Sequence, residues 1–507
     1  MLKKLLVLCS MLIAVLFTGC GEKKEPQTPL KEKKDVLVYA QLSEGKTLDP
    51  QDSTEQYSQV VTTQIYDRLV EIDEMTGKLV PGLADSWERV DDLTLIMHLN
   101  KTAKFHNGDP LKASDVKFTL ERAKSKPKVA HLFKAIKDVE ILDDNTIKIV
   151  TEEPFAPLLN HLSHKTAAII SEKYFKENGD NYFMKPIGTG SYKFKNWVVG
   201  ESITLEANEE YFKGKPSIKT IIIKGIPEEN SRVIGLETGE IDIAEGIATI
   251  GRKAVEDSKD LTLMESPSTS VTYLGFSLKN PILQDREVRR AISMGINREE
   301  IIKGLMFGDV KIANGFLAPA VFGYSKDSKV LSYNKEEAKR IIESKGLKGA
   351  KLSLVTSNNQ LRAQMAEIMQ AQLKEIGLDV TLQTLEWGAF LKSTGNGELD
   401  MFMMGWGPST YDGDYGLYPN FHSSQFGNNG NRTFYSNEKI DALLDSAKKE
   451  MDLEKRRGMY IEVINIVNED APVLPINYSN TIIGVTNKLE GVQPISYPMF
   501  YKYNFKK

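Results

Sequence analysis

A tryptophan and two carboxylates stand close together after an apolar stretch of the chain. Residues 401–404 read MFMM and lead through Gly405 into Trp406, and Asp412 and Asp414 follow. An ammonium group is costly to remove from water, and a carboxylate can compensate that cost through charge-assisted hydrogen bonds. The indole offers an apolar face to a side chain or a peptide plane. These residue types favour a site for a small zwitterion, while a polar turn beside a packed tryptophan explains them equally well.

Small residues surround the tryptophan. Gly405 and Gly407 lack a Cβ atom, so a ligand could approach their backbone closely. Backbone pairing of this kind binds peptides with little regard to their sequence, as in strand addition. Ser409 and Thr410 follow, and we include both hydroxyls in the candidate ligand site.

Strands and helices in alternation must position these residues, which indicates an α/β fold. Strands are expected at 36–40, 94–99, 138–142, 146–150, 201–206, 218–224, 351–356, 379–385 and 399–404. Helices are expected at 57–70, 115–123 (with Ser114 as N-cap), 285–295, 297–307, 334–346 and 361–376. The carboxyl end of a buried strand is where α/β sheets present ligand loops. We therefore expect a Gly-rich loop after residue 404.

The first residues indicate export. A basic pair precedes the apolar run 5–17, and small residues lead to Cys20, which is the pattern of a secretory signal. The run has 13 residues, too few for a helix that crosses a hydrocarbon core of about 30 Å. The junction resembles a bacterial lipobox, which implies cleavage before Cys20 and lipid on its sulfur. We expect a signal peptide at 1–19 and the lipidated cysteine with a solvated tether at 20–35; the alternative is an N-terminal membrane helix.

Charge, size and cysteine content limit the function. Without the two lysines of the leader, 63 Lys and Arg face 69 Asp and Glu, a net charge of −6, which disfavours nucleic acid as a partner. About 470 residues remain beyond leader and tether, more than one core usually supports, so two or three lobes are expected. Cys9 lies in the leader, so Cys20 is the one thiol of the mature chain and no internal disulfide is expected.

The sequence shows no pattern of a catalytic centre. His161 and His164 have metal-like spacing, but no HExxH pattern accompanies them and the six histidines are scattered. There is no GxSxG nucleophile elbow and no phosphate loop. We expect no catalytic residue, no metal and no cofactor, and any ATPase must be another chain.

Four long segments resemble a known family. They are PGLADSWERVDDLTLIMHLNKTAKFHNGDPLKASDVKFTLERA (81–123), PIGTGSYKFKNWVVGESITLEANEEYFKGKP (186–216), SRVIGLETGEIDIAEGI (231–247) and REVRRAISMGINREEII (286–302). Together, and in this order, they resemble the peptide and nickel class of extracellular solute-binding proteins of ABC importers. The resemblance extends over about 36–500.

The resemblance implies a two-lobed periplasmic-binding-protein-like fold with an inserted third subdomain. Lobe I would comprise 36–75, 190–275 and 480–507, the inserted subdomain 76–189, and lobe II 276–479. Ligand would close the lobes about a hinge of crossing strands. A monomer, anchored by lipid outside the cytoplasm, would capture a small peptide and deliver it to a membrane permease driven by a separate ATPase.

Within this family, residues 401–424 are most similar to glutathione-binding members and close oligopeptide-binding relatives. Peptide-binding members carry an Asp three residues after the tryptophan, where it pairs with the ligand's ammonium; here that position is Ser409. The resemblance implies that Asp412 or Asp414 takes over this role. The alternatives are a binding protein for nickel complexes or haem and, from another class, a membrane-tethered hydrolase, which would need an activated nucleophile or an open metal site.

The carboxylate of a peptide needs a cation. Arg362, at the start of the expected helix 361–376, could hold it through two parallel hydrogen bonds, or it could be a solvated arginine of a first helical turn. Tyr57 and Gln56 could meet the ligand from the opposite lobe. Trp387 is a further candidate for the cleft, with core packing as the alternative.

Overall fold

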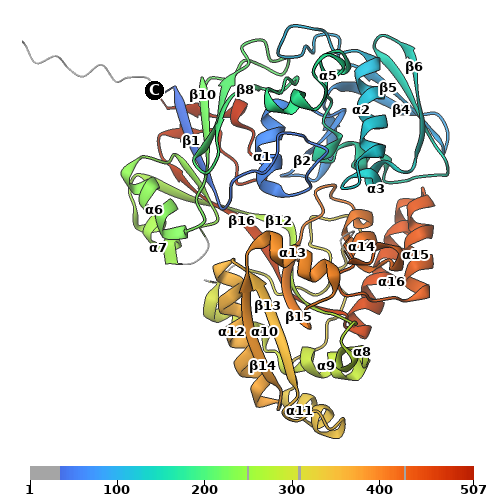
Figure 1. Cartoon of the computed structure of the whole chain (residues 1–507), viewed down its shortest axis with the longest axis vertical. Coiled ribbons are helices and arrows are strands. Elements are labelled where there is room, and N and C mark those ends of the chain that lie inside the picture. Colours follow the sequence, from blue (N-terminus) through green and yellow to red (C-terminus); the bar gives the residue numbers. More distant parts are fainter. Residues whose placement is uncertain (1–34, 248–249, 307–309, 428–429, 507) are drawn as a thin grey trace, which may run out of the picture. The chain divides into compact units, whose positions relative to one another are not determined.

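Two long strands join the halves of a large sheet. The computed structural model describes residues 35–247, 250–306, 310–427 and 430–506, so the predicted signal peptide and Cys20 lie outside the described residues. In the described part, ten strands form one mixed sheet, and Figure 1 labels most of them. Their order is β14 (Asp379–Leu385), β13 (Lys351–Ser357), β15 (Met401–Trp406), β12 (Leu261–Phe276), β16 (Val473–Thr486), β11 (Ile243–Glu245), β1 (Val36–Gln41), β10 (Thr220–Gly225), β9 (Ser202–Ala207) and β8 (Tyr192–Val198).

The central pair, β12 and β16, runs antiparallel from one half of the sheet into the other. Leu261 pairs with Thr486 at one end, and Gly275 pairs with Val473 at the other. The register shifts between Pro267 and Val271, where a bulge interrupts the ladder. Strand β16 also pairs with β11 in one half of the sheet, and β12 also pairs with β15 in the other half. The pair of β12 and β16 therefore joins the two halves (Figure 1).

In the lobe I half, β1 lies parallel to both β10 and β11, and helices α1 (Gln56–Ile65), α6 (Glu229–Thr238) and α7 (Ile250–Asp257) complete it. The Glu55 carboxylate caps α1 by accepting the backbone N–H groups of Tyr57 and Ser58, each with an N–O distance of 2.8 Å. The predicted helix 57–70 is too long at its carboxyl end. The chain becomes extended at Tyr66, and β2 (Val70–Asp73) pairs with β3 (Lys78–Pro81).

Between these segments, a second sheet folds with its own core. Its strands are β4 (Ala84–Arg89), β5 (Thr94–Leu99), β7 (Thr146–Thr151) and β6 (Ile136–Asp143), all antiparallel, with α2 (Ala113–Ser125) packed on β6 and α4 (Leu158–Leu162) following β7. The predicted cap at Ser114 is wrong. The N-cap residue is Lys112, whose backbone N–H donates to the Asp115 carboxylate at 2.9 Å.

The lobe II half contains the strongest helix predictions, and each agrees with the structure to within two residues at either end. Its helices are α8 (Pro281–Gln284), α9 (Arg286–Gly295), α10 (Arg298–Leu305), α11 (Lys335–Ser344), α12 (Gln360–Glu375), α13 (Trp387–Asn396), α14 (Gly413–Phe421), α15 (Glu438–Lys449) and α16 (Leu453–Asp470). Helix α12 packs on β13 and β14, as Figure 1 shows.

The expected loop after residue 404 differs from the structure. Strand β15 continues through Trp406, and helix α14 begins at Gly413, so the expected loop is a short turn between a strand and a helix. The mixed α/β class is confirmed. The division into lobes and an inserted subdomain stays a prediction, because residues 35–506 form one compact unit, and we keep these terms as names for the residue ranges given above.

Candidate ligand-binding site

Arg362 is a half-buried cation without a partner. It stands in the first turn of α12, where its backbone N–H donates to the Asn359 side chain, with an N–O distance of 3.0 Å. Its guanidinium makes no hydrogen bond or ion pair with any described residue. Burial lowers the pKa of Arg362, while Tyr57 and Tyr273 act in the opposite direction. The side chain therefore keeps its charge and its donors available for an anion.

Gly405 makes room for this guanidinium. A Cβ atom on residue 405 would lie 2.6 Å from Nη2 of Arg362. Any larger residue would push the guanidinium away, so the glycine of β15 and the arginine of α12 form one unit. The sequence placed both in the candidate site, and the structure brings them together.

Glu245 is a half-buried acid that sequence reasoning missed. It ends strand β11 and accepts hydrogen bonds from Nε2 of Gln56 at 2.7 Å and from the hydroxyl of Tyr39 at 3.5 Å. Burial raises the pKa of Glu245 to about 7, although Arg232 opposes this shift. No lysine or arginine of the described residues forms an ion pair with it. A neutral glutamine and a phenol are its hydrogen-bond partners, and Arg232 acts on this carboxyl through its charge without forming an ion pair with it.

Tyr57 stands within electrostatic reach of both groups. It occupies the first turn of α1, and burial raises the pKa of its hydroxyl. Glu245 raises that pKa further, whereas Arg362 lowers it. Tyr57 therefore lies near Arg362, while Gln56 contacts Glu245.

Trp406 and the turn after it contact the inserted subdomain. Nε1 of Trp406 donates to the carbonyl of Tyr415 at 3.0 Å, and the two rings stand 5.6 Å apart. Gly407 is exposed and Ser409 is half-buried. Thr410 is buried, and its carbonyl accepts a hydrogen bond from Nδ2 of Asn160 at 2.9 Å. The turn is thus built into a contact between lobe II and the inserted subdomain.

Asp412 already has a cation inside lobe II. Its side chain is 4% exposed, forms an ion pair with Arg456 and accepts a hydrogen bond from the Tyr460 hydroxyl at 3.3 Å. It also caps α14 by accepting the N–H of Asp414 at 2.8 Å. All three contacts converge on Oδ1, and the ion pair with Arg456 already balances the charge of Asp412, so the geometry does not favour its predicted contact with a ligand ammonium.

Asp414 links lobe II to the inserted subdomain. Its Oδ2 atom lies 3.0 Å from Nε2 of His161, whose Nδ1 lies 2.8 Å from the carbonyl of Leu132. Both ring nitrogens of His161 therefore lie within hydrogen-bond distance of an oxygen atom, one from lobe II and one from the inserted subdomain. Burial alone would raise the pKa of Asp414, but His161 and Lys448 hold it below its ordinary value. The Oδ1 atom is buried and without a hydrogen-bond partner among the described residues.

Two other predicted residues have local packing roles. Trp387 begins α13 and stacks on Phe390, with ring centroids 5.9 Å apart. His164, which the metal-like spacing singled out, contacts the Thr166 hydroxyl through Nδ1 at 2.8 Å. Among the described residues, no group of three or more histidines, cysteines and acids could hold a metal ion.

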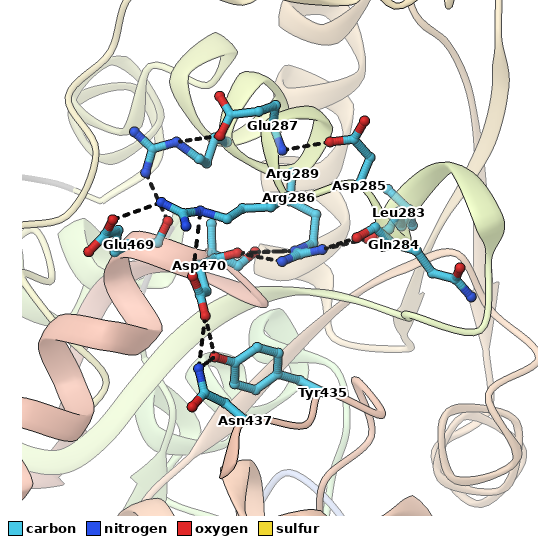
Figure 2. Close-up of polar contacts among 12 residues, drawn as sticks. Leu283, Gln284, Asp285, Arg286, Glu287, Arg289, Tyr435, Asn437, Glu469 and Asp470 are labelled. Carbon is cyan, nitrogen blue, oxygen red and sulfur yellow. Dashed lines mark hydrogen bonds and ion pairs between the residues drawn. The ribbon is translucent and has the colours of Figure 1, made fainter. Parts of the chain in front are cut away.

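A second buried arginine shows how a structural guanidinium is satisfied. Arg289 of α9 donates from Nη1 to the carbonyls of Leu283 and Gln284, each at 2.9 Å, and from Nη2 to the carbonyl of Asp470 at 2.7 Å. Its Nε reaches the carbonyls of Asp470 and Ala471 at 3.2 and 3.3 Å. Figure 2 shows these contacts at the ends of α8 and α16.

Comparison with known proteins identifies the family of the chain. The model of the bacterial extracellular solute-binding proteins, family 5 Middle, matches residues 78–428. Oligopeptide-binding protein AppA of Bacillus subtilis is 29% identical, with 98% of this chain and 95% of the relative covered. Glutathione-binding protein GsiB of Pectobacterium atrosepticum is 30% identical, with 92% of each chain covered.

A solved structure agrees with these relatives. Periplasmic binding protein DppA of Helicobacter pylori, in complex with the peptide STSA, superposes with a TM-score of 0.86 at 29% identity, covering 93% of this chain and 98% of that one. The expected periplasmic-binding-protein-like fold is confirmed. In the part of the chain that the structure describes, no helix is both long and apolar enough to cross a membrane. The chain belongs to the bacterial extracellular solute-binding proteins of family 5.

Proposed function

We propose that the chain captures peptides outside the cytoplasm and delivers them to the permease of an ABC importer. Family membership and the peptide-binding relatives support this function. The observation that supports it most directly is Arg362, a half-buried guanidinium without a partner beside Gly405. A peptide always has a terminal carboxylate, and arginine binds that group through two parallel hydrogen bonds.

The mechanism is capture followed by closure. The open lobes admit a peptide, Arg362 of lobe II receives its carboxylate, and Tyr57 of lobe I approaches from the other side. The bulge in the crossing strands between Pro267 and Val271 is the hinge. Closure expels water from around the charged groups, which strengthens each of their interactions. Trp406, Gly407, Ser409 and Thr410 are proposed to line the ligand near the turn, together with Trp387.

The ammonium of the peptide needs an acid. In the loop after Trp406, Asp414 is the better of the two predicted acids, because its Oδ1 atom has no partner whereas Asp412 is bound to Arg456. Asp412→Ala and Asp414→Ala should each be titrated with peptide. If both variants bind like the parent protein, the assignment of the ammonium to this loop is wrong.

Export and anchoring complete the proposal. Residues 1–19 would be the signal peptide, Cys20 would bear the lipid, and residues 20–35 would be the tether. The mature protein would work as a monomer on the outer face of the cell membrane or in the periplasm, with the permease and a separate ATPase as partners. Labelling with radioactive palmitate tests the anchor: incorporation that persists in Cys20→Ala would overturn it.

A thermal-shift panel tests the ligand class. It should contain peptides of different lengths, oxidised and reduced glutathione, haem and nickel with free histidine. A ligand at 100 times its dissociation constant adds about 2.7 kcal/mol to the free energy of unfolding. Stabilisation by peptides supports the proposal, and stabilisation by glutathione above other peptides narrows it to that tripeptide. Stabilisation by haem or nickel alone would refute it. Ligand recovered unchanged after incubation supports binding without catalysis, and recovered fragments would indicate the tethered hydrolase.

A further inference from the structure

The charges facing Tyr57 are of opposite sign and belong to different lobes. Glu245 ends a strand of lobe I, and Arg362 begins a helix of lobe II. Neither group is among those that shift the pKa of the other, although both shift the pKa of Tyr57. The two charges therefore act on the same phenol from different lobes and do not form an ion pair with each other.

The fold surrounds Glu245 with partners that are not available cations. Gln56 and Tyr39 donate neutral hydrogen bonds. Arg232 is the nearest positive charge named for this carboxyl, but its guanidinium is occupied by backbone. Its Nε donates to the carbonyl of Glu245 at 2.8 Å, Nη1 to the carbonyls of residues 226 and 227, and Nη2 to that of Gly246 at 3.0 Å.

An acid in this state costs free energy unless a ligand balances it. A desolvated carboxylate that has no cation in direct contact destabilises the folded protein. A substituted ammonium placed beside Glu245 would provide both the charge and the donors that the site lacks. A ligand that extends from Glu245 to Arg362 would at the same time place its carboxylate beside the Arg362 guanidinium.

We propose that Glu245, in place of the acids of the loop after Trp406, is a specificity-determining residue that receives the cationic group of the ligand, the amino end of a peptide, on lobe I. This inference rests on the proposed function and specifies how it works. The preferred ligand is then a zwitterion that bridges the lobes, with its ammonium at Glu245 and its carboxylate at Arg362. Because each lobe holds one end, binding favours closure.

Binding should release a proton from Glu245. Burial raises the pKa of Glu245 to about 7, so the free protein at neutral pH holds a carboxyl that is partly protonated. An adjacent ammonium favours the carboxylate and lowers that pKa. The affinity for peptide therefore rises from pH 6 toward pH 8 and falls above it, as the free peptide's amino group, with a pKa of about 8, loses its own proton.

The other groups around Glu245 keep their charge across this range. Burial raises the pKa of Tyr39 on β1 and of Tyr57 on α1, so both phenols stay neutral. Arg232 on α6 and Arg362 on α12 stay cationic, because arginine does not deprotonate in proteins. The part of the pH dependence that disappears when Glu245 is changed is therefore its own.

The experiment is a calorimetric titration of the full chain with alanine peptides, from dialanine to hexaalanine, as free amines and as N-acetyl derivatives. Glu245→Gln keeps the shape and an acceptor for Gln56 and Tyr39. It should weaken binding of the free amine by at least about tenfold, which corresponds to about 1.4 kcal/mol. The N-acetyl peptide should bind parent and variant equally. Glu240→Gln, an exposed acid of the same lobe, is the matched control.

The outcomes are distinguishable. Proton release in the parent near pH 7, absent in Glu245→Gln and restored in part by Glu245→Asp, supports the inference. Equal affinity of the parent and Glu245→Gln for the free amine would overturn it while leaving the proposed function intact. Absence of binding by the parent to every peptide would refute the proposed function itself, and this inference with it.

Discussion

Two arginines of lobe II, one buried and one half-buried, differ in whether their guanidinium groups have hydrogen-bond partners. Arg289 is 3% exposed, and all its donor groups point at backbone carbonyls where α8 and α16 end (Figure 2). Arg362 is half-buried, at the start of α12, and no described residue accepts a hydrogen bond from its guanidinium. Burial lowers the pKa of both. The difference lies in the source of the hydrogen-bond acceptors. Backbone carbonyls of the folded chain accept from Arg289, and a ligand would accept from Arg362.

The contrast separates stability from binding. Carbonyls at helix C-termini lack intrahelical partners and favour a cation, so Arg289 stabilises the folded chain. A desolvated guanidinium without a partner does the reverse, because its lost hydration is not compensated. The desolvation of Arg362 therefore lowers the stability of the free protein, and ligand binding would compensate this loss. Such local violations of stability rules are typical of functional sites.

The largest expected effect is on stability at Arg289. Arg289→Ala leaves several buried carbonyls without donors and should lower the free energy of unfolding by about 3–5 kcal/mol. Urea denaturation measures this loss. Peptide affinity of the folded fraction should not change. A loss below about 1 kcal/mol would show that water replaces the guanidinium as donor to these carbonyls. Arg289 would then not be an arginine that stabilises the fold, and its contrast with Arg362 would be wrong.

Arg362→Ala should produce the opposite pattern. Peptide affinity should fall at least thirtyfold, or by about 2 kcal/mol, because the ligand carboxylate loses its partner. The free energy of unfolding should be unchanged or should rise, since an uncompensated buried charge is removed. Arg362→Lys keeps the charge without the paired donors and should lie between. Arg340→Ala, at an exposed position of α11, is the matched control.

Asp414 tests the contact between lobe II and the inserted subdomain. His161 and Lys448 hold the pKa of Asp414 below its ordinary value, which is about 3.9 in unfolded chains. Its contribution to stability is therefore complete above that pH and is lost as pH falls through the folded pKa. Asp414→Asn should cost about 1.5 kcal/mol at neutral pH and make the loss of stability below pH 4 shallower.

The control for this comparison is Asp445→Asn, an exposed acid of α15 beside His422. Its stability profile below pH 4 should match that of the parent. An equally steep acid transition in Asp414→Asn and in the parent would mean that the link through His161 contributes no stability.

The smallest expected effect is at Gly405. A Cβ atom there would stand 2.6 Å from Nη2 of Arg362. The guanidinium is the flexible end of a long side chain, so Gly405→Ala should displace it without unfolding the protein. Peptide affinity should fall about fivefold, or by about 1 kcal/mol, with little change in urea midpoint. Gly458→Ala, at an exposed position of α16 where a Cβ atom would meet nothing within 4 Å, should bind like the parent; equal losses at both glycines would argue against a specific contact with Arg362.

The sequence predicts the elements of lobe II well and the partners of its charges poorly. Apolar residues at helical spacing locate α12 to within one residue at each end, because local periodicity is enough. The stop of α1 at Ile65 was missed, since it depends on pairing between β2 and β3. Asp412 and Asp414 were recognised as unusual, but Arg456 and His161, which bind them, lie 44 and 253 residues away along the chain.

Glu245 shows the limit most plainly. In the sequence it is one of 69 acids, with no periodicity or motif of its own. Its hydrogen-bond partners are Gln56 and Tyr39, which lie 189 and 206 residues away in the sequence. Tyr39 is brought near by the parallel pairing of β1 with β11, and Gln56 comes from the first turn of α1. Arg362 was accessible from the sequence because the carboxylate of a peptide requires a cation, and this arginine opens a helix that the apolar spacing predicts.

The most direct test is a thermodynamic cycle between Arg362 and the ligand carboxylate. Calorimetry would compare the tightest-bound alanine peptide, as free acid and as C-terminal amide, with the parent protein and with Arg362→Ala. Amidation should weaken binding to the parent at least about tenfold and should not affect binding to Arg362→Ala. An equal penalty for amidation in both proteins would contradict the account, because the carboxylate would then be recognised elsewhere.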